Sequence, residues 1–255
     1  MRSLPFSRVG LNLFSRFGFR LQLRASGQKP EVPKPTDEAP IDINFAQQVV
    51  IGFIVLLFSL TVHESSHAWT ADRLGDPTAR ELGRVSLNPI VHADLVGTVI
   101  FPLLALIGGV PLIGWAKPVP VNVRRLQHPR RDYVLVAAAG PASNLLLALL
   151  AATALLLVPV SPLILGEPNV SAPVATFLSL AVQLNVLLAV FNMLPIPPLD
   201  GGNVLGGLLP RRFAGAFYAV RPYGILILYV LMFTGRLGSF IGPPSNLLLS
   251  WLPQR

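Results

Sequence analysis

The chain has 255 residues, of which 52% are hydrophobic and 13% are charged, and its formal net charge is +8. Soluble domains carry roughly 25% charged residues, so this composition predicts a protein that lies mostly in lipid. The chain contains no cysteine, which excludes disulfides, thiolate metal sites and cysteine nucleophiles. The basic residues are interspersed with long apolar runs and form no basic helix or stacking motif. We therefore expect the chain to contact the lipid bilayer and not nucleic acid.

The first 43 residues are predicted to lie outside the membrane domain. Residues 1–30 contain six basic residues and no acidic one, and residues 28–42 are rich in proline and charge. The basic part is compatible with a targeting peptide, a membrane-surface helix or a disordered tail, and the sequence does not choose among them. The proline-rich part is typical of a linker. Residues 44–255 are predicted to form one membrane-embedded domain.

Five apolar segments follow in this domain. A helix that spans about 30 Å of hydrocarbon needs roughly 20 residues, which the first, third and fourth segments can supply; the fifth can do so only if flanking residues extend it. We predict an all-α polytopic membrane protein with about four to six transmembrane or re-entrant helices, and with short β-strands or loops near its functional site. The segments are Phe45–Val62, which continues as helix through two histidines, Leu95–Trp115, Tyr133–Val158, Val174–Leu194 and Tyr223–Phe233.

Ionisable residues stand at the end of the first apolar segment, in "TVHESSH". His63 and His67 are four residues apart, so on a helix they share one face and can bind a single Zn²⁺. Glu64 points to the side, where it can reach a metal-bound water without being a ligand. This H-E-x-x-H pattern is typical of zinc hydrolases. Ionisable groups at membrane depth cost several kcal/mol unless they are paired or functional, which favours a zinc site over a structural histidine pair.

A catalytic zinc normally has three protein ligands and one open position. After Asp94 the only acidic residues are Asp132, Glu167 and Asp200. Asp132 stands beside two arginines and is interpreted as a loop charge, and Glu167 in "LGEPN" as a turn residue. Asp200 follows the fourth apolar segment in "LPIPPLDGG", where prolines and glycines break the helix and let the backbone fold inward. Asp200 is therefore the predicted third ligand.

At these residues the chain resembles the site-2 protease family, intramembrane zinc metalloproteases that cut transmembrane substrates. The resemblance covers about residues 50–205 and is carried by "HESSH", "AAGPASN" (Ala138–Asn144) and "NMLPIPPLDG" (Asn192–Gly201). It implies one zinc ion held by His63, His67 and Asp200, and Glu64 as the residue that activates water. It also makes Asn144 and Asn192 candidates for substrate or oxyanion contacts, and membrane-anchored proteins the expected substrates.

The positions of these residues also predict the topology. Both the histidines and Asp200 must lie at one depth, so the third and fourth segments cross the membrane and return, and the loop 159–173 lies on the opposite side. The second segment cannot then be one complete crossing, and its prolines and glycines suit a re-entrant hairpin or broken helix. The loops on the zinc side contain eleven lysines and arginines and the opposite loop none. By the positive-inside rule the site faces the cytoplasm of a cell membrane, or the matrix or stroma in an organelle. The basic residues 1–30 would then lie on the far side, which this topology does not explain.

Two other functions compete with proteolysis. A zinc- or proton-linked transporter would also place histidine and aspartate in the membrane. It would be expected to show an inverted repeat, however, and it assigns no function to Glu64. A non-catalytic membrane scaffold would be expected to have lost a ligand or the base, and all four residues are present. For a protease, "GRVSLNP" (83–89) or "KPVPVNV" (117–123) is the expected edge strand that binds an unwound substrate by strand addition. The sequence leaves the oligomeric state open.

Overall fold

The computed structural model describes residues 43–100, 116–158 and 171–253, and within these ranges it is helical and contains no β-strand. Four helical runs are long and apolar enough to cross a membrane: Gln47–Arg73, Pro129–Leu157, Pro173–Asn192 and Arg211–Phe233. This confirms the prediction of an all-α polytopic membrane protein.

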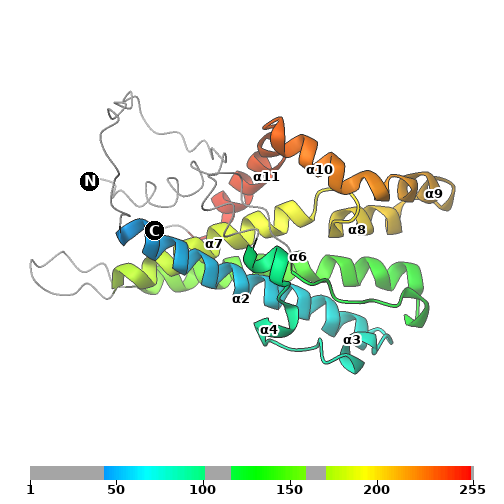
Figure 1. The fold of residues 1–255 in the computed structure, drawn as a ribbon, viewed down its shortest axis with the longest axis horizontal. Helices are drawn as coiled ribbons and strands as arrows, with labels where there is room; N and C mark the ends of the chain where they lie inside the picture. Colours follow the sequence, from blue (N-terminus) through cyan, green and yellow to red (C-terminus); the bar gives the residue numbers. More distant parts are fainter. Residues whose placement is uncertain (1–42, 101–115, 159–170, 254–255) are drawn as a thin grey trace, which may run out of the picture.

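Three long helices form the centre of the molecule: α2 (Ile43–Arg73), α6 (Pro129–Leu157) and α7 (Ser171–Asn192). Helix α6 packs against both α2 and α7, and α2 also contacts α7. As Figure 1 shows, α6 begins at the end of the bundle where α2 finishes, and α7 returns to that end. The interfaces contain small buried residues such as Ala148, Ala151 and Ala181. Small residues let helix backbones approach closely. Within a lipid bilayer the hydrophobic effect does not drive helices together, so their association depends on close packing of this kind.

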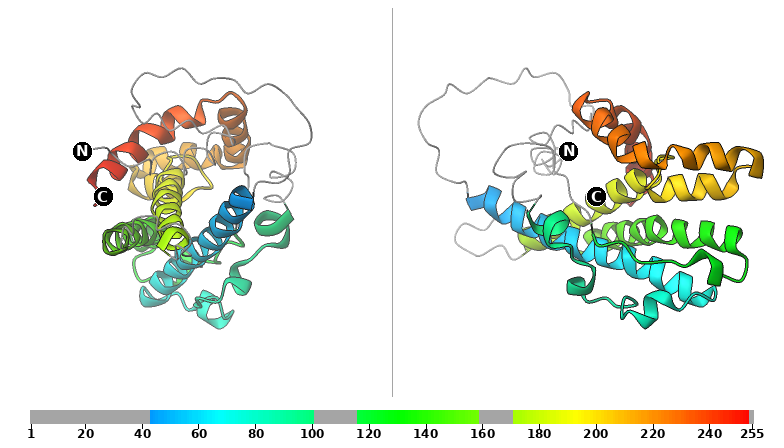
Figure 2. Two further views of the ribbon diagram at one scale, coloured as in Figure 1. Left: turned by 90° about the vertical axis from the view of Figure 1, so that its left-hand side faces the viewer. Right: turned by 45° about the vertical axis from the view of Figure 1, so that its right-hand side comes forward.

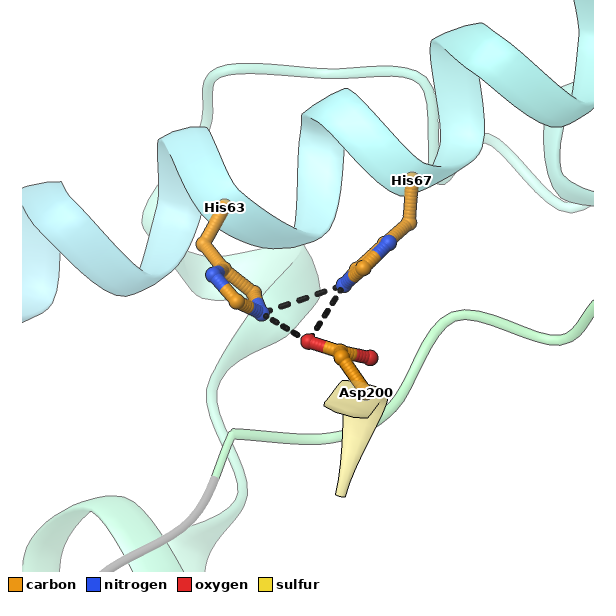
Figure 3. Close-up of side chains that lie close together, drawn as sticks. All are labelled: His63, His67 and Asp200. Carbon is orange, nitrogen blue, oxygen red and sulfur yellow. Dashed lines mark hydrogen bonds and ion pairs between the residues drawn. The ribbon is translucent and has the colours of Figure 1, made fainter. Parts of the chain in front are cut away.

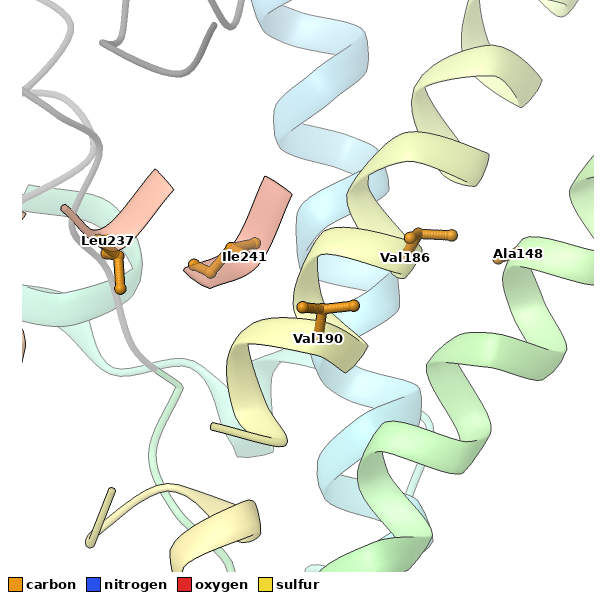
Figure 4. Close-up of a cluster of buried hydrophobic side chains, with 5 residues drawn as sticks. All are labelled: Ala148, Val186, Val190, Leu237 and Ile241. Carbon is orange, nitrogen blue, oxygen red and sulfur yellow. The ribbon is translucent and has the colours of Figure 1, made fainter. Parts of the chain in front are cut away.

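The C-terminal helix α11 (Leu237–Trp251) packs against α7. Its buried side chains form one apolar cluster with α6 and α7, drawn in Figure 4, whose members are Ala148, Val186, Val190, Leu237 and Ile241. Large apolar side chains on the outer faces remain exposed, for example Leu150 on α6 and Leu226 on α10. A surface of this kind is suited to contact with lipid chains.

Shorter elements follow α2 and α7 along the chain. After α2 come α3 (Thr78–Glu81), α4 (Pro89–His92) and η1 (Leu95–Ile100), and η2 (Val123–Arg125) precedes α6. After α7 come α8 (Asp200–Leu208), α9 (Arg211–Ala219), η3 (Arg221–Tyr223) and α10 (Gly224–Phe233). Helix α8 packs against α6, which brings it back to the bundle; Figure 2 shows this from two further directions.

Some sequence predictions are changed by the structure. The fifth apolar segment does gain length, because α9 and η3 precede α10 in one 23-residue run. Asp132 is not a loop charge: it is buried in the first turn of α6, where its carboxylate accepts the N–H of His128 at 2.7 Å. Neither residues 83–89 nor residues 117–123 form a strand. In the second of these segments two prolines lack N–H groups, and the N–H groups of Val119 and Asn122 donate to the side chains of Glu64 and Asp76 instead.

Three predictions concern residues outside the described ranges. These are nearly all of the non-membrane segment 1–43, most of the re-entrant segment Leu95–Trp115, and most of the loop 159–173 with Glu167. Of the re-entrant segment only the short helix η1 is described, and the description resumes at Ala116.

Candidate metal centre

The structure brings the three predicted ligands together, although Asp200 is more than 130 residues from the histidines in sequence. The Nε2 atoms of His63 and His67 are 3.1 Å apart. Asp200 Oδ2 lies 3.1 Å from His63 Nε2 and 3.3 Å from His67 Nε2. Figure 3 shows the two rings side by side on α2 with the carboxylate facing both. Among the described residues, these three are the only group of histidine, aspartate or glutamate side chains that could hold a metal ion.

The histidines occupy one face of α2 because they are one helical turn apart. His63 is 4% exposed and His67 is 8% exposed, so both rings are held inside the protein. His63 Nδ1 hydrogen-bonds Asn144 Oδ1 at 2.6 Å, and His67 Nδ1 hydrogen-bonds the carbonyl of Val136 at 2.7 Å. Both acceptors belong to α6. Each Nδ1 therefore carries the ring proton, which leaves the lone pair of each Nε2 free to bind a metal.

A buried polar network fixes the orientation of Asn144. Its side-chain N–H₂ group donates to Asn185 Oδ1 at 2.8 Å and to the carbonyl of Ser59 at 3.4 Å. Asn185, on α7, in turn donates to Ser59 Oγ at 2.9 Å. Since the amide nitrogen of Asn144 is used in this way, its oxygen must be the group that accepts the proton of His63. The network joins α2, α6 and α7 behind one ligand.

This network changes the interpretation of Asn144 and adds a residue that the sequence analysis missed. Asn144 is fully buried and both ends of its amide are bonded, so in this structure it orients His63. Its contact with substrate or oxyanion stays a prediction. Asn185 was not singled out, although an amide in the middle of the fourth apolar segment is the kind of residue that marks a polar site in a membrane helix.

Gly140 allows α6 to pass directly beneath the two rings. A Cβ atom at this position would lie 2.6 Å from both Cε1 and Nε2 of His63, and would also collide with Nε2 of His67. No other residue type leaves this space empty. Glycine in "AAGPASN" is therefore required by the metal site itself, and not only by helix packing.

Asp200 is the first residue of α8, which follows the non-helical segment 193–199 after α7. Gly201 and Gly202 bring α8 close to this segment, because a Cβ atom at either would overlap the backbone of residues 193–197. Burial acts to raise the pKa of the Asp200 carboxyl, but hydrogen bonds and charge interactions with His63 and His67 lower it to about 2. The carboxylate is therefore ionised at neutral pH and is suited to bind a cation.

Glu64 is separated from this ligand face by its position on the helix. It is half-buried, and its Oε2 accepts the backbone N–H of Val119 at 3.0 Å.

Asn192, the last residue of α7, donates its side-chain N–H to the carbonyl of Leu188 at 3.0 Å, within its own helix. Its predicted contact with substrate stays a prediction.

The ligand set fits a zinc ion. In a tetrahedral site with metal–ligand distances of about 2.0–2.1 Å, two ligand atoms are about 3.3–3.4 Å apart. The three ligand atoms are separated by 3.1 to 3.3 Å. Two neutral imidazoles and one carboxylate are a usual set of protein ligands for catalytic zinc, and they leave one position open. Asp200 Oδ2 is buried and faces the Nε2 atoms of both histidines, as expected of an atom that binds a metal ion together with them.

Comparisons with known proteins agree with this chemistry. A family model described as Peptidase family M50 matches residues 51–164 and 159–234. YwhC from Bacillus subtilis, provisionally named a zinc metalloprotease, is 40% identical over 74% of this chain and 82% of its own length. Rip2 from Mycobacterium tuberculosis H37Rv, named in the same way, is 36% identical over 76% of this chain and 70% of its own length. No solved structure gives a significant match.

Proposed function

The chain belongs to peptidase family M50, the site-2 protease family, and is a multi-pass membrane zinc metalloprotease; we propose that it cuts within the membrane. Its substrates in this proposal are membrane-anchored proteins, and the bonds it hydrolyses lie within or next to their transmembrane segments. The proposal goes beyond the family assignment because it specifies where the scissile bond lies.

One observation carries this proposal: two of the three ligands, His63 and His67, lie inside a membrane-spanning run. His63 is ten residues before the end of the run Gln47–Arg73. At 1.5 Å per residue this places the histidine about 15 Å from that end of the helix. A scissile bond must reach the same depth to react. A soluble protein would have to insert a loop that far, whereas a transmembrane segment is already there.

In this proposal the side chains of the site have separate roles in hydrolysis. His63, His67 and Asp200 would hold the zinc ion, which when bound acts as a Lewis acid that activates water and polarises the scissile carbonyl. Glu64 is the general base: its carboxylate removes a proton from the attacking water and returns it to the departing amine. Asn144 and the carbonyl of Val136 hold the histidine rings in the tautomer that binds a metal.

The substrate must also change its backbone structure before it is cut. In a helix each carbonyl accepts the N–H of a residue four positions later, so a scissile bond within a helix is shielded. The proposal therefore requires local unwinding of the substrate at the depth of the histidines. A transmembrane segment that contains helix-breaking residues would unwind more easily and would be the better substrate.

The zinc side of the protein is proposed to face the cytoplasm. Basic residues gather at the end of the bundle where α2 finishes, in α3, η2 and the first turns of α6 and α9. Lysine and arginine are enriched in cytoplasmic loops of membrane proteins. A cell membrane is the proposed location.

The decisive experiment is cleavage of a single-span reporter protein by purified enzyme in lipid vesicles. Wild-type protein is expected to cut the reporter, and mass spectrometry should place the cut within or beside its transmembrane segment. Glu64→Gln, which removes the base but keeps the size of the side chain, should bind zinc and cut nothing. Cleavage of soluble proteins alone, or equal cleavage by both proteins, would refute the proposal. Zinc transport into the vesicles without cleavage would favour the transporter instead.

A further inference from the structure

An extended segment between η1 and η2 passes directly beside Glu64. This segment, residues 117–122 or "KPVPVN", is called the strap below. The backbone N–H of Val119 donates to Glu64 Oε2 at 3.0 Å. We propose that the strap positions the Glu64 carboxylate through this N–H group, and that the buried charges of Arg84 and Asp76 hold the strap in place. The inference rests on the proposed function, because it takes Glu64 to be the general base.

The first end of the strap is held by Arg84. Its Nη2 atom donates to the carbonyls of Lys117 at 2.5 Å and Pro118 at 3.2 Å, immediately before Val119. Arg84 is only 6% exposed, and on the described residues it forms no ion pair. Burying a guanidinium without a counter-ion is unfavourable. The hydrogen bonds from Arg84 to the two strap carbonyls offset part of this free-energy cost.

The second end of the strap is held by Asp76. Its Oδ2 accepts the N–H of Asn122 at 2.6 Å, while Oδ1 accepts the N–H of Thr78 at 3.1 Å. Asp76 is fully buried. Hydrogen bonds to an ionised acceptor are about twice as strong as neutral ones, so this carboxylate is a firm attachment point. Asp76 precedes α3 and Arg84 follows it, and they attach to opposite ends of the strap.

Hydrogen bonds through His92 also connect the strap to α2. The N–H of Lys117 donates to the carbonyl of His92 at 2.9 Å. The ring of His92, which is 1% exposed, lies with Nε2 2.8 Å from the carbonyl of Ser86 and 3.3 Å from Ser65 Oγ. Ser65 is the next residue after Glu64 on α2. The donor that contacts Glu64 is thus tied to the helix that carries Glu64, and the two cannot shift independently.

The composition of the strap suits this task. Pro118 and Pro120 flank Val119, and proline fixes φ and has no N–H. The amide of Val119 is therefore an isolated donor on a stiff backbone. Its bond to Oε2 restricts the flexible side chain of Glu64, and Oε1, which has no hydrogen bond among the described residues, can take the proton. Restricting a catalytic group in this way before the reaction raises the rate without strengthening substrate binding.

The experiment removes the N–H group of Val119 and uses zinc content and matched control variants to check that the protein is still folded. Val119→Pro deletes the donor, whereas Val119→Ala shortens the same side chain and keeps the donor. We expect kcat at least tenfold lower for Val119→Pro than for Val119→Ala, with equal KM and equal zinc content. Arg84→Met should lower kcat in the same way. Arg80→Met is its matched control, because Arg80 on α3 is exposed, pairs with Asp72 at the end of α2 and should keep wild-type activity.

A double-mutant cycle separates positioning of the base from general support of the structure. In a Glu64→Asp background the shorter carboxylate should no longer reach Val119, so Val119→Pro should reduce the residual rate by less than twofold. An undiminished loss in that background would overturn the proposal. Equal kcat for the two Val119 variants would do the same, as would loss of zinc from both Val119→Pro and Arg84→Met. These results are distinct from failure of the proposed function, in which wild-type protein itself cuts no membrane substrate.

Discussion

Gly140 lies where α6 passes beneath the histidines, so Gly140→Ala is a minimal test of the metal site. A Cβ atom there would lie 2.6 Å from Nε2 of His63. Nonbonded heavy atoms prefer about 3.5 Å, so the added methyl group must displace the ring by about 1 Å. The ring cannot turn aside freely, because its Nδ1 is bonded to Asn144 at 2.6 Å. A displacement of about 1 Å in a catalytic group can cost roughly 10²-fold in rate, and we expect a loss of at least this size.

The assay measures zinc per protein chain, cleavage of a single-span reporter and thermal stability on the same preparation. Gly140→Ala should lose both zinc and activity. Gly242→Ala in α11 is the control, since a Cβ atom there meets nothing within 4 Å. Both glycines directly precede a proline inside a helix, so the effect of an added Cβ on the local backbone is similar and the control isolates the collision. If Gly140→Ala bound a full zinc ion and cut at the wild-type rate, the close approach of α6 would not define the metal site.

Three further predictions test other parts of the structure. Asn144→Ala removes the acceptor for the ring proton of His63 and should weaken zinc binding about 10- to 100-fold, as measured by competition with a chelating dye; unchanged affinity would contradict that role. A chelator should abolish cleavage by wild-type protein and added zinc should restore it, whereas His67→Ala should stay inactive after zinc is added. Because the chain has no cysteine, single cysteines report topology directly: Arg124→Cys should react with an impermeant thiol reagent from the cytoplasmic side and Ser161→Cys from the opposite side, and the reverse pattern would invert the proposed orientation.

The sequence predicts most of the helices and the residues that converge on the metal, for different physical reasons. His63, Glu64 and His67 are related by the period of one helix, so their geometry follows from local spacing. Asp200 is far away in sequence, but few acidic residues are available and it follows a helix break at membrane depth. Both arguments need no knowledge of how the helices pack.

The remaining parts of the site depend on packing between distant segments. The carbonyl of Val136 bonds His67 only because α6 crosses α2 at that level, and every residue has a carbonyl, so no sequence signal marks this one. The expected edge strand at 117–123 is wrong for a related reason. Its prolines are compatible with an edge strand, but backbone groups of Lys117, Val119 and Asn122 bond to the side chains of Arg84, Glu64 and Asp76, which only the fold brings near.

Successive residues on a helix are about 100° apart, so His63 and Glu64 face different neighbours. The histidine face contacts α6 and α8, which supply the groups that fix the rings and the third ligand. The glutamate face contacts the strap. Zinc binding and base positioning therefore depend on separate elements. Substitutions on α6, such as Gly140→Ala, should lower zinc content and activity together, whereas Val119→Pro should lower the rate while zinc stays bound. A strap variant that lost zinc in proportion to activity would show that the two faces are not independent.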